Sequence, residues 1–101
     1  MNFKIRFTPE AEETYDALVA QLRHRWGDKF VSKFEIKISK CLDIISKTPE
    51  IYPIADTDKE IRKCVLHKNC SMLYKVYGST ILVVCFWDNP DRSLLEFLKH
   101  S

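Results

Sequence analysis

Hydrophobic and polar residues alternate at the start of the chain. Phe3, Ile5 and Phe7 are separated by polar residues, and this period of two is typical of a strand with one buried face. Thr8 can cap a helix and Pro9 fits the first helical position. The pattern therefore predicts a strand that leads directly into a helix.

The hydrophobic residues that follow recur at helical spacing on both sides of Gly27. Glycine favours the left-handed backbone at a helix C-terminus, and Asp28 can cap a second helix. Thr48 and Pro49 should end that helix. Because the connection is short, we expect an antiparallel helical hairpin. Its two apolar stripes consist of Ala11, Tyr15, Leu18, Val19, Leu22 and Trp26, and of Val31, Phe34, Ile38, Cys41, Leu42 and Ile45.

Three more strands are predicted in the second half of the chain. They span Ile61–His67, Cys70–Tyr77 and Thr80–Trp87, and the turn pairs Lys68-Asn69 and Gly78-Ser79 separate them. The last strand is apolar throughout, which is typical of an internal strand covered on both faces. The strand at the start of the chain should then lie at the free edge of the sheet.

Length and composition agree with one globular domain. The chain has 101 residues, of which 46% are hydrophobic and 30% charged, and a second core would need roughly 50 more residues. We therefore expect an α+β fold over residues 1–101. In it, an N-terminal strand, a two-helix antiparallel hairpin and a three-stranded antiparallel meander form a four-stranded sheet.

No segment of the sequence indicates export or membrane insertion. The longest apolar run is far shorter than the ~20 residues that a membrane span needs, and the N-terminal residues contain no apolar signal core. The expectation is a cytoplasmic protein with no membrane association. The net charge of +2 is too small to indicate nucleic-acid binding by itself.

The cysteines raise the question of disulfides or a metal. Cys41, Cys64, Cys70 and Cys85 lie among apolar neighbours and form no C-x-x-C pair, so we expect buried thiols rather than disulfides. His67 and Cys70 have a metal-like spacing, but no second pair accompanies them and a structural zinc site needs four ligands. No metal site and no cofactor are predicted.

Two-residue turns on both sides of the middle strand fix a register for the predicted sheet. In this register Arg62 lies opposite Lys75, and one face is almost wholly apolar, so the helices should cover it. That face should carry Ile61, Val65, Met72, Tyr74, Val76, Ile81, Val83 and Cys85. The predicted core consists of Trp26, Phe34, Leu42, Val65, Tyr74 and Val83.

The other face of the predicted sheet is a candidate binding surface. Two like charges opposite each other cost stability, so Arg62 and Lys75 either await an anionic partner or are solvated and point apart. No helix remains to cover the apolar residues of this face; either the C-terminal segment around Leu94, Leu95, Phe97 and Leu98 or a protein partner covers them. The predicted partner-binding set is Leu73, Leu82, Val84, Phe86, Arg62 and Lys75.

Several motifs, in this order, resemble the RelE/ParE family, the toxins of bacterial type II toxin–antitoxin modules. The matching segments cover nearly the whole chain: FTPEAEETYDAL, KTPEIYPI, IRKCVLHKNCSMLYKV and ILVVCFWDNPDR. Pro49 after the hairpin and the Phe86-Trp87-Asp88-Asn89 ending resemble ParE-like members in particular. The resemblance implies a growth-inhibiting toxin, with a role in plasmid stabilization, that a cognate antitoxin wraps and holds inactive in a hetero-oligomer.

The family contains two activities. RelE-like members cut messenger RNA on the ribosome, and ParE-like members poison DNA gyrase. RNA cleavage needs a base, a proton donor and cations for the phosphate. Where RelE-like toxins carry a phosphate-binding arginine this chain has Ser71, and Phe97 or a neighbour stands where they carry a tyrosine. Arg62 and Arg92 match other basic positions of the RelE pattern.

The catalytic residues therefore stay unassigned, with Arg62, Lys75, Arg92 and His67 as candidates. The first three supply charge but no acid–base chemistry, and a histidine beside a turn is more often a solvated or packing residue. The resemblance thus favours a non-enzymatic, ParE-like toxin that binds and inhibits DNA gyrase. The alternatives are a RelE-like ribosome-dependent mRNA endoribonuclease and a non-toxic protein of the toxin fold that serves only as a binding partner.

Overall fold

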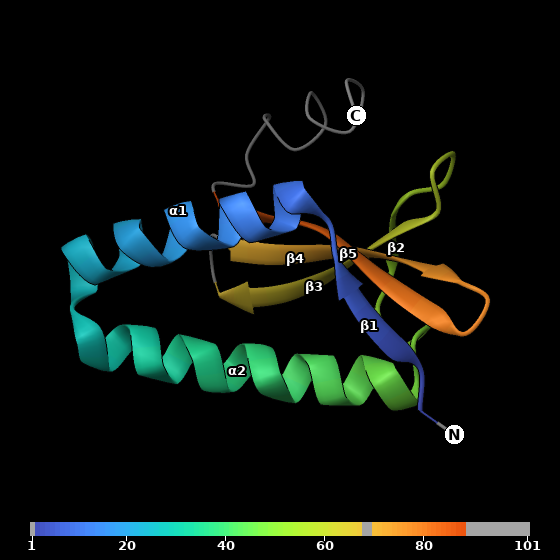
Figure 1. Ribbon diagram of the computed structural model, residues 1–101, viewed down its shortest axis with the longest axis horizontal. Helices are drawn as coiled ribbons and strands as arrows, with labels where there is room; N and C mark the ends of the chain where they lie inside the picture. Colours follow the sequence, from blue (N-terminus) through green and yellow to red (C-terminus); the bar gives the residue numbers. More distant parts are fainter. Residues whose placement is uncertain (1, 68–69, 89–101) are drawn as a thin grey trace.

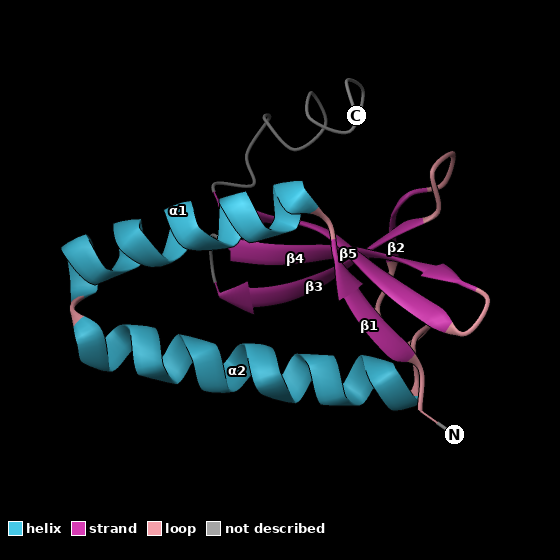
Figure 2. Cartoon of the chain, viewed as in Figure 1, coloured by secondary structure: helices cyan, strands magenta, loops and turns pink. Residues whose placement is uncertain are grey.

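A computed structural model describes residues 2–67 and 70–88 of the chain. Both helices lie on the same side of a five-stranded sheet (Figure 1, Figure 2), whose strand order is β1-β5-β4-β3-β2. The predicted α+β fold is confirmed. The elements are β1 (Lys4–Phe7), α1 (Pro9–Trp26), α2 (Asp28–Lys47), β2 (Ile54–Asp56), β3 (Ile61–His67), β4 (Cys70–Tyr77) and β5 (Thr80–Asp88).

The sheet has one strand more than predicted. β1 lies at the edge, as expected, and runs parallel to β5, with Ile5 opposite Ile81. The extra strand is β2, which pairs antiparallel with β3 in a segment that the sequence marks as a loop. With only three residues and Pro53 immediately before it, β2 is too short for an alternating pattern to reveal it.

The helix ends largely follow the predicted capping. The Thr8 hydroxyl oxygen accepts a hydrogen bond from the N–H of Ala11 at 2.9 Å, and Gly27 adopts a left-handed φ of 87°. The expected cap by Asp28 is wrong. Asp28 is the first residue of α2 and makes no capping bond; its carboxylate accepts from Nε of Arg23 at 2.8 Å.

A bulge in the middle of the sheet changes the predicted register. His67 lies opposite Cys70, as expected, but the register shifts between Val65 and His67. As a result Arg62 lies opposite Tyr74 and not opposite Lys75. A shift of one residue moves side chains to the other face. The prediction that Arg62 and Lys75 are cross-strand neighbours is therefore wrong.

A second bulge lies in β5. The β4–β5 register shifts between Leu73 and Tyr74, so Val84 has no direct partner in β4. Beyond the bulge, Phe86 packs into the core under the helices and Cys85 packs into a smaller cluster on the outer face. Both placements reverse the prediction, which put Phe86 outside and Cys85 under the helices.

The start of α1 holds this bulge in place. The hydroxyl of Thr8 donates to the carbonyl of Val84 at 2.7 Å, and Oγ1 of Thr14 accepts from the N–H of Phe86 at 2.9 Å. Both threonines belong to the segment FTPEAEETYDAL. This motif therefore positions β5 as well as the first turn of α1.

The main core lies between the helices and the sheet. Trp26 and Val65, which were expected in it, are 60% and 58% exposed, so these two assignments are wrong. Val65 lies beside the β3 bulge and faces outward, and Trp26 stacks on Phe30 at the end of the hairpin, with ring centroids 5.7 Å apart. The other predicted core residues do pack there: Phe34, Leu42, Tyr74 and Val83.

The cysteines divide into two pairs. The sulfur atoms of Cys41 of α2 and Cys64 of β3 are in contact, but their Cα atoms are 7.4 Å apart, which is farther than the roughly 4.4 to 6.8 Å that a disulfide spans. The expectation of thiols at these two positions therefore stays a prediction. Cys70 and Cys85 are buried thiols, as expected, and burial raises the pKa of the Cys85 thiol to about 12. Among the described residues, no helix is long and apolar enough to cross a membrane.

Candidate functional site

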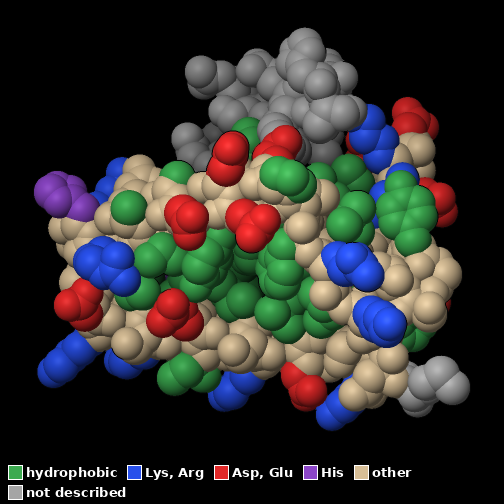
Figure 3. All heavy atoms as spheres, viewed as in Figure 1, with side chains coloured by type: hydrophobic (Ala, Val, Ile, Leu, Met, Phe, Trp, Pro, Cys, Tyr) green, Lys and Arg blue, Asp and Glu red, His purple; other side chains and the backbone are tan. Residues whose placement is uncertain are grey.

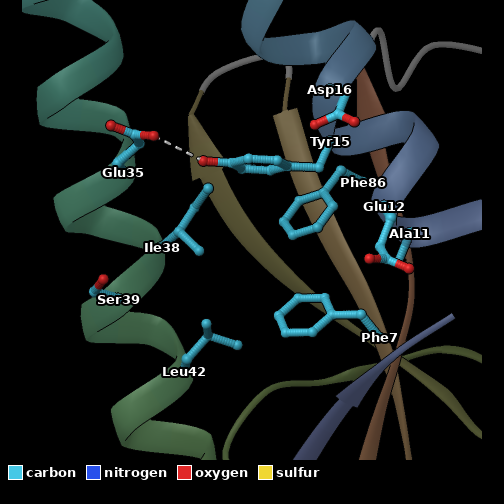
Figure 4. A pocket seen from close by; sticks show the side chains of 10 residues that line it. All are labelled: Phe7, Ala11, Glu12, Tyr15, Asp16, Glu35, Ile38, Ser39, Leu42 and Phe86. Atoms are coloured by element: carbon cyan, nitrogen blue, oxygen red, sulfur yellow. Dashed lines mark hydrogen bonds between the residues drawn. The ribbon is translucent and has the colours of Figure 1, made fainter. Parts of the chain in front are cut away.

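A groove of about 440 Å³ opens between the two helices and the strands β1 and β5. Figure 3 shows it as an apolar hollow between α1 and α2, with acidic side chains above it. Figure 4 shows the lining residues from close by. They are Phe7, Ala11, Glu12, Tyr15, Asp16, Glu35, Ile38, Ser39, Leu42 and Phe86.

Aromatic rings form the sheet side of the groove. The ring centroid of Phe86 lies 6.5 Å from that of Phe7 and 5.2 Å from that of Tyr15. Ile38 and Leu42 of α2 face these rings from the opposite wall (Figure 4). Phe7 remains 42% exposed. The groove thus presents apolar contact area that the described part of the chain does not fill.

The rim of the groove is acidic. Glu12 and Asp16 project from α1 and Glu35 from α2, and none of the lining residues is a lysine or arginine. The hydroxyl of Tyr15 donates to the Glu35 carboxylate at 3.1 Å and links the two helices across the groove. Burial, followed by the nearby Glu35 carboxylate, raises the pKa of Tyr15, which keeps it a hydrogen-bond donor. This rim favours a basic partner.

Sequence reasoning missed this groove because it depends on the β5 bulge. Without the bulge, Phe86 points away from the helices and the aromatic wall does not exist. The signal that could have indicated the groove is the pair Glu12 and Asp16, which flank Tyr15 at a spacing of four residues. That spacing places two carboxylates along one edge of an apolar stripe.

Arg62 and Tyr74 form a clamp on the segment that follows α2. Nη1 of Arg62 donates to the carbonyls of Tyr52 at 2.7 Å and Glu50 at 3.2 Å, and the side chain is only 18% exposed. The hydroxyl of Tyr74 donates to the carbonyl of Pro49 at 2.7 Å. Burial raises the pKa of Tyr74 to about 12. The segment KTPEIYPI is thus held by its backbone carbonyls.

The other charged candidates lie apart from this clamp. Lys75 places its Nζ over the ring of a neighbouring tyrosine, 4.9 Å from the centroid. His67 lies at the other end of β3 from Arg62, roughly 15 Å along the strand, and its ring meets that of Phe30 edge-on at 5.4 Å. Arg92 lies outside the described residues. The described candidates are therefore not gathered around one substrate group.

The predicted partner-binding residues are divided between the two faces of the sheet. Leu73 is fully buried on the outer face, beside Ile61. Leu82 and Val84 are half-buried, and Phe86 belongs to the groove. The prediction of one continuous apolar surface is wrong for Leu73 and Phe86, and binding by any of these residues stays a prediction.

In comparisons with known proteins, no family model matches the chain, and no curated protein does. Several solved structures match over most of the chain at low identity, and three of them are representative. The first comes from the chromosomal ParDE toxin–antitoxin system of P. aeruginosa, with a TM-score of 0.70, 15% identity, and coverage of 86% of this chain and 96% of that chain.

The second is a copper-bound L66S mutant toxin from Helicobacter pylori, with a TM-score of 0.65, 14% identity, and coverage of 92% of this chain and 98% of that chain. The third is the toxin–antitoxin complex RelBE2 of Mycobacterium tuberculosis, with a TM-score of 0.57, 13% identity, and coverage of 88% of this chain and 100% of that chain. At these identities the likeness concerns the fold. This chain has the fold of the RelE/ParE-type toxins.

Proposed function

We propose that the protein is the toxin of a bacterial type II toxin–antitoxin module, that it acts in the cytoplasm by binding DNA gyrase, and that a cognate antitoxin neutralises it. The fold supports the toxin assignment. The observation that favours inhibition by binding over RNA cleavage is the clamp, because the guanidinium of Arg62 already donates hydrogen bonds to backbone carbonyls. Such a protein would arrest growth when free and stabilise a plasmid that carries the module.

The positions of the other polar candidates also favour a toxin that acts by binding its target over one that cleaves RNA. A nuclease needs its acid, base and cation within hydrogen-bond reach of one phosphate and its neighbouring hydroxyl, about 3 Å. His67 lies roughly 15 Å from Arg62 along β3. Ser71 is 3% exposed and pairs with Trp87. These described residues have structural roles and do not form an acid–base pair.

The groove is the site that we assign to the antitoxin. Its exposed aromatic wall gives an amphipathic segment apolar anchors, each worth about 1.5 to 3 kcal/mol when fully buried. Its rim of Glu12, Asp16 and Glu35 would pair with basic residues on that segment. The matching structures from the ParDE system and from RelBE2 are both of toxin–antitoxin assemblies. The rival site is the outer face around Leu82 and Val84.

The test compares the two activities in parallel with purified protein. We expect inhibition of DNA supercoiling by gyrase and no cleavage of messenger RNA on ribosomes. The variant His67→Ala should inhibit supercoiling as strongly as the parent, because the ring of His67 packs edge-on against that of Phe30. Ribosome-dependent cleavage that falls by about 100-fold or more in His67→Ala would instead make the protein a RelE-like endoribonuclease. If the protein shows neither activity, it is a non-toxic binding partner.

A further inference from the structure

The outward side of α2 carries a row of lysines. At about 100° per residue, the core residues of α2 occupy one side of the helix. In Figure 3, Lys and Arg side chains project along the lower edge of the molecule, where α2 lies. We call the residues on that side, all of which are exposed, the lysine face. They are Lys29, Lys33, Ile36, Lys37, Lys40 and Ile44.

The positive charge of this face has no counterpart within the described chain. The carboxylate of Asp28 accepts from Arg23 at 2.8 Å, and that of Asp43 lies 3.3 Å from Nζ of Lys47. The third acid of α2, Glu35, faces the groove. No carboxylate of residues 2–67 or 70–87 lies within ion-pair distance of the four lysines of the face.

The lysine face works against the stability of the helix that carries it. Lys29 and Lys33, and then Lys33 and Lys37, are like charges four residues apart, an arrangement that destabilises a helix. Ile36 and Ile44 are 57% and 39% exposed within the same row. A side that only needs solvation gains nothing from these isoleucines. Uncompensated charge around exposed apolar side chains is what a docking surface presents.

The spacing of the charges indicates the kind of partner. The steps from Lys29 to Lys33, Lys37 and Lys40 are four, four and three residues, or about 6, 6 and 4.5 Å along the axis. Carboxylates on one side of another α-helix repeat with these same steps. Nucleic-acid surfaces more often use arginine forks and stacking aromatic rings, and the lysine face has neither.

We propose that the lysine face docks an acidic amphipathic helix of a protein partner. Carboxylates of that helix pair with the lysines, and its apolar residues cover Ile36 and Ile44. The face lies on a different side of α2 from the groove residues Ile38 and Leu42, so both surfaces can be occupied at once. This docking does not depend on whether the target is gyrase or the ribosome.

The experiment uses two labelled helical peptides of identical composition as probes. In the matched peptide, glutamates recur every three or four residues beside leucines on one side; in the scrambled peptide they are spread around the helix. By fluorescence anisotropy at low salt, we expect the full chain to bind the matched peptide about 10-fold more tightly. The double variant K33Q/K37Q should remove most of this difference, and Ile36→Asp should reduce it.

The control removes the same charge elsewhere. In K63Q/K75Q, the two lysines lie on strands β3 and β4 of the sheet, so affinity for the matched peptide should change by less than about 2-fold. Circular dichroism confirms that each variant is folded. Equal binding of the two peptides, or an equal loss in both double variants, overturns the proposal. If a short DNA duplex binds more tightly than the matched peptide, and if this binding depends on Lys33 and Lys37, the lysine face is a nucleic-acid surface instead.

Discussion

The clamp and the groove use their polar and apolar groups in opposite ways. In the clamp, the guanidinium of Arg62 and the hydroxyl of Tyr74 are bound to carbonyls of the segment after α2. In the groove, the ring of Phe7 is 42% exposed and the carboxylates of Glu12 and Asp16 face solvent. The residues that most resemble catalytic machinery therefore support the fold, and the surface available for binding lies elsewhere.

This difference separates two kinds of effect. Changes in the clamp should lower the free energy of unfolding and leave partner affinity intact once the protein is folded. Changes at exposed residues of the groove should lower partner affinity and leave the free energy of unfolding nearly unchanged. The same separation explains why Arg62, a catalytic candidate from the sequence, has a structural role in the described chain.

The largest effect is expected at Tyr74, which is fully buried. Tyr74→Ala removes a core aromatic ring and the donor to Pro49, so the free energy of unfolding should fall by about 3 to 5 kcal/mol. Tyr74→Phe keeps the ring and should lose only about 1 kcal/mol. The control is Tyr77→Ala, whose side chain is 54% exposed. Urea denaturation measures all three, and equal losses for Tyr74→Ala and Tyr77→Ala would contradict the clamp.

The next effect is expected at Arg62. Arg62→Met keeps the apolar part of the side chain but leaves the carbonyls of Glu50 and Tyr52 without their donor, which should cost about 1.5 to 3 kcal/mol. Lys63→Met, at the neighbouring position of β3, is the control. Thermal unfolding and the supercoiling assay are measured together. If Arg62→Met is as stable as the parent but no longer inhibits supercoiling, Arg62 has a functional role.

The smallest effect is a loss of stability at alkaline pH. Burial raises the pKa of Tyr74 from its usual 10 to about 12, so the folded state holds its proton more tightly than the unfolded chain. The stabilisation is complete below pH 10 and is lost as the pH rises towards about 12. Cys85 behaves in the same way from pH 9 upward. Tyr74→Phe should flatten the decline above pH 10, whereas an unchanged decline would remove Tyr74 as its source.

Alternation and helical spacing were sufficient to predict most elements of the fold. Thr8, Pro9 and Gly27 mark the ends of α1, and the three antiparallel strands begin at the predicted residues. These signals are local: a cap, a turn or a stripe depends on residues a few positions apart. The same locality explains why the strand β2 was missed, because its three residues are defined by their pairing with β3.

The candidate site was harder to predict because it depends on two bulges. The segment ILVVCFWD is apolar at almost every position, so a shift of one residue leaves no polar residue on the wrong face to signal it. The bulge is held from the distant start of the helical hairpin, by Thr8 and Thr14. Phe86 is therefore predicted on the outer face but lines the groove. Arg62 is predicted to be a free cation but belongs to the clamp.

The most direct measurement compares the groove with the outer face of the sheet. The protein encoded by the adjoining gene, as the candidate antitoxin, is titrated against the parent, Phe7→Ser and Lys75→Glu by calorimetry. Both substitutions are at partly exposed side chains, and thermal unfolding checks that each variant is folded. We predict that Phe7→Ser weakens binding by about 10-fold or more and that Lys75→Glu leaves it within about 2-fold. Parental affinity in Phe7→Ser with a loss in Lys75→Glu would place the antitoxin on the outer face and contradict the assignment of the groove.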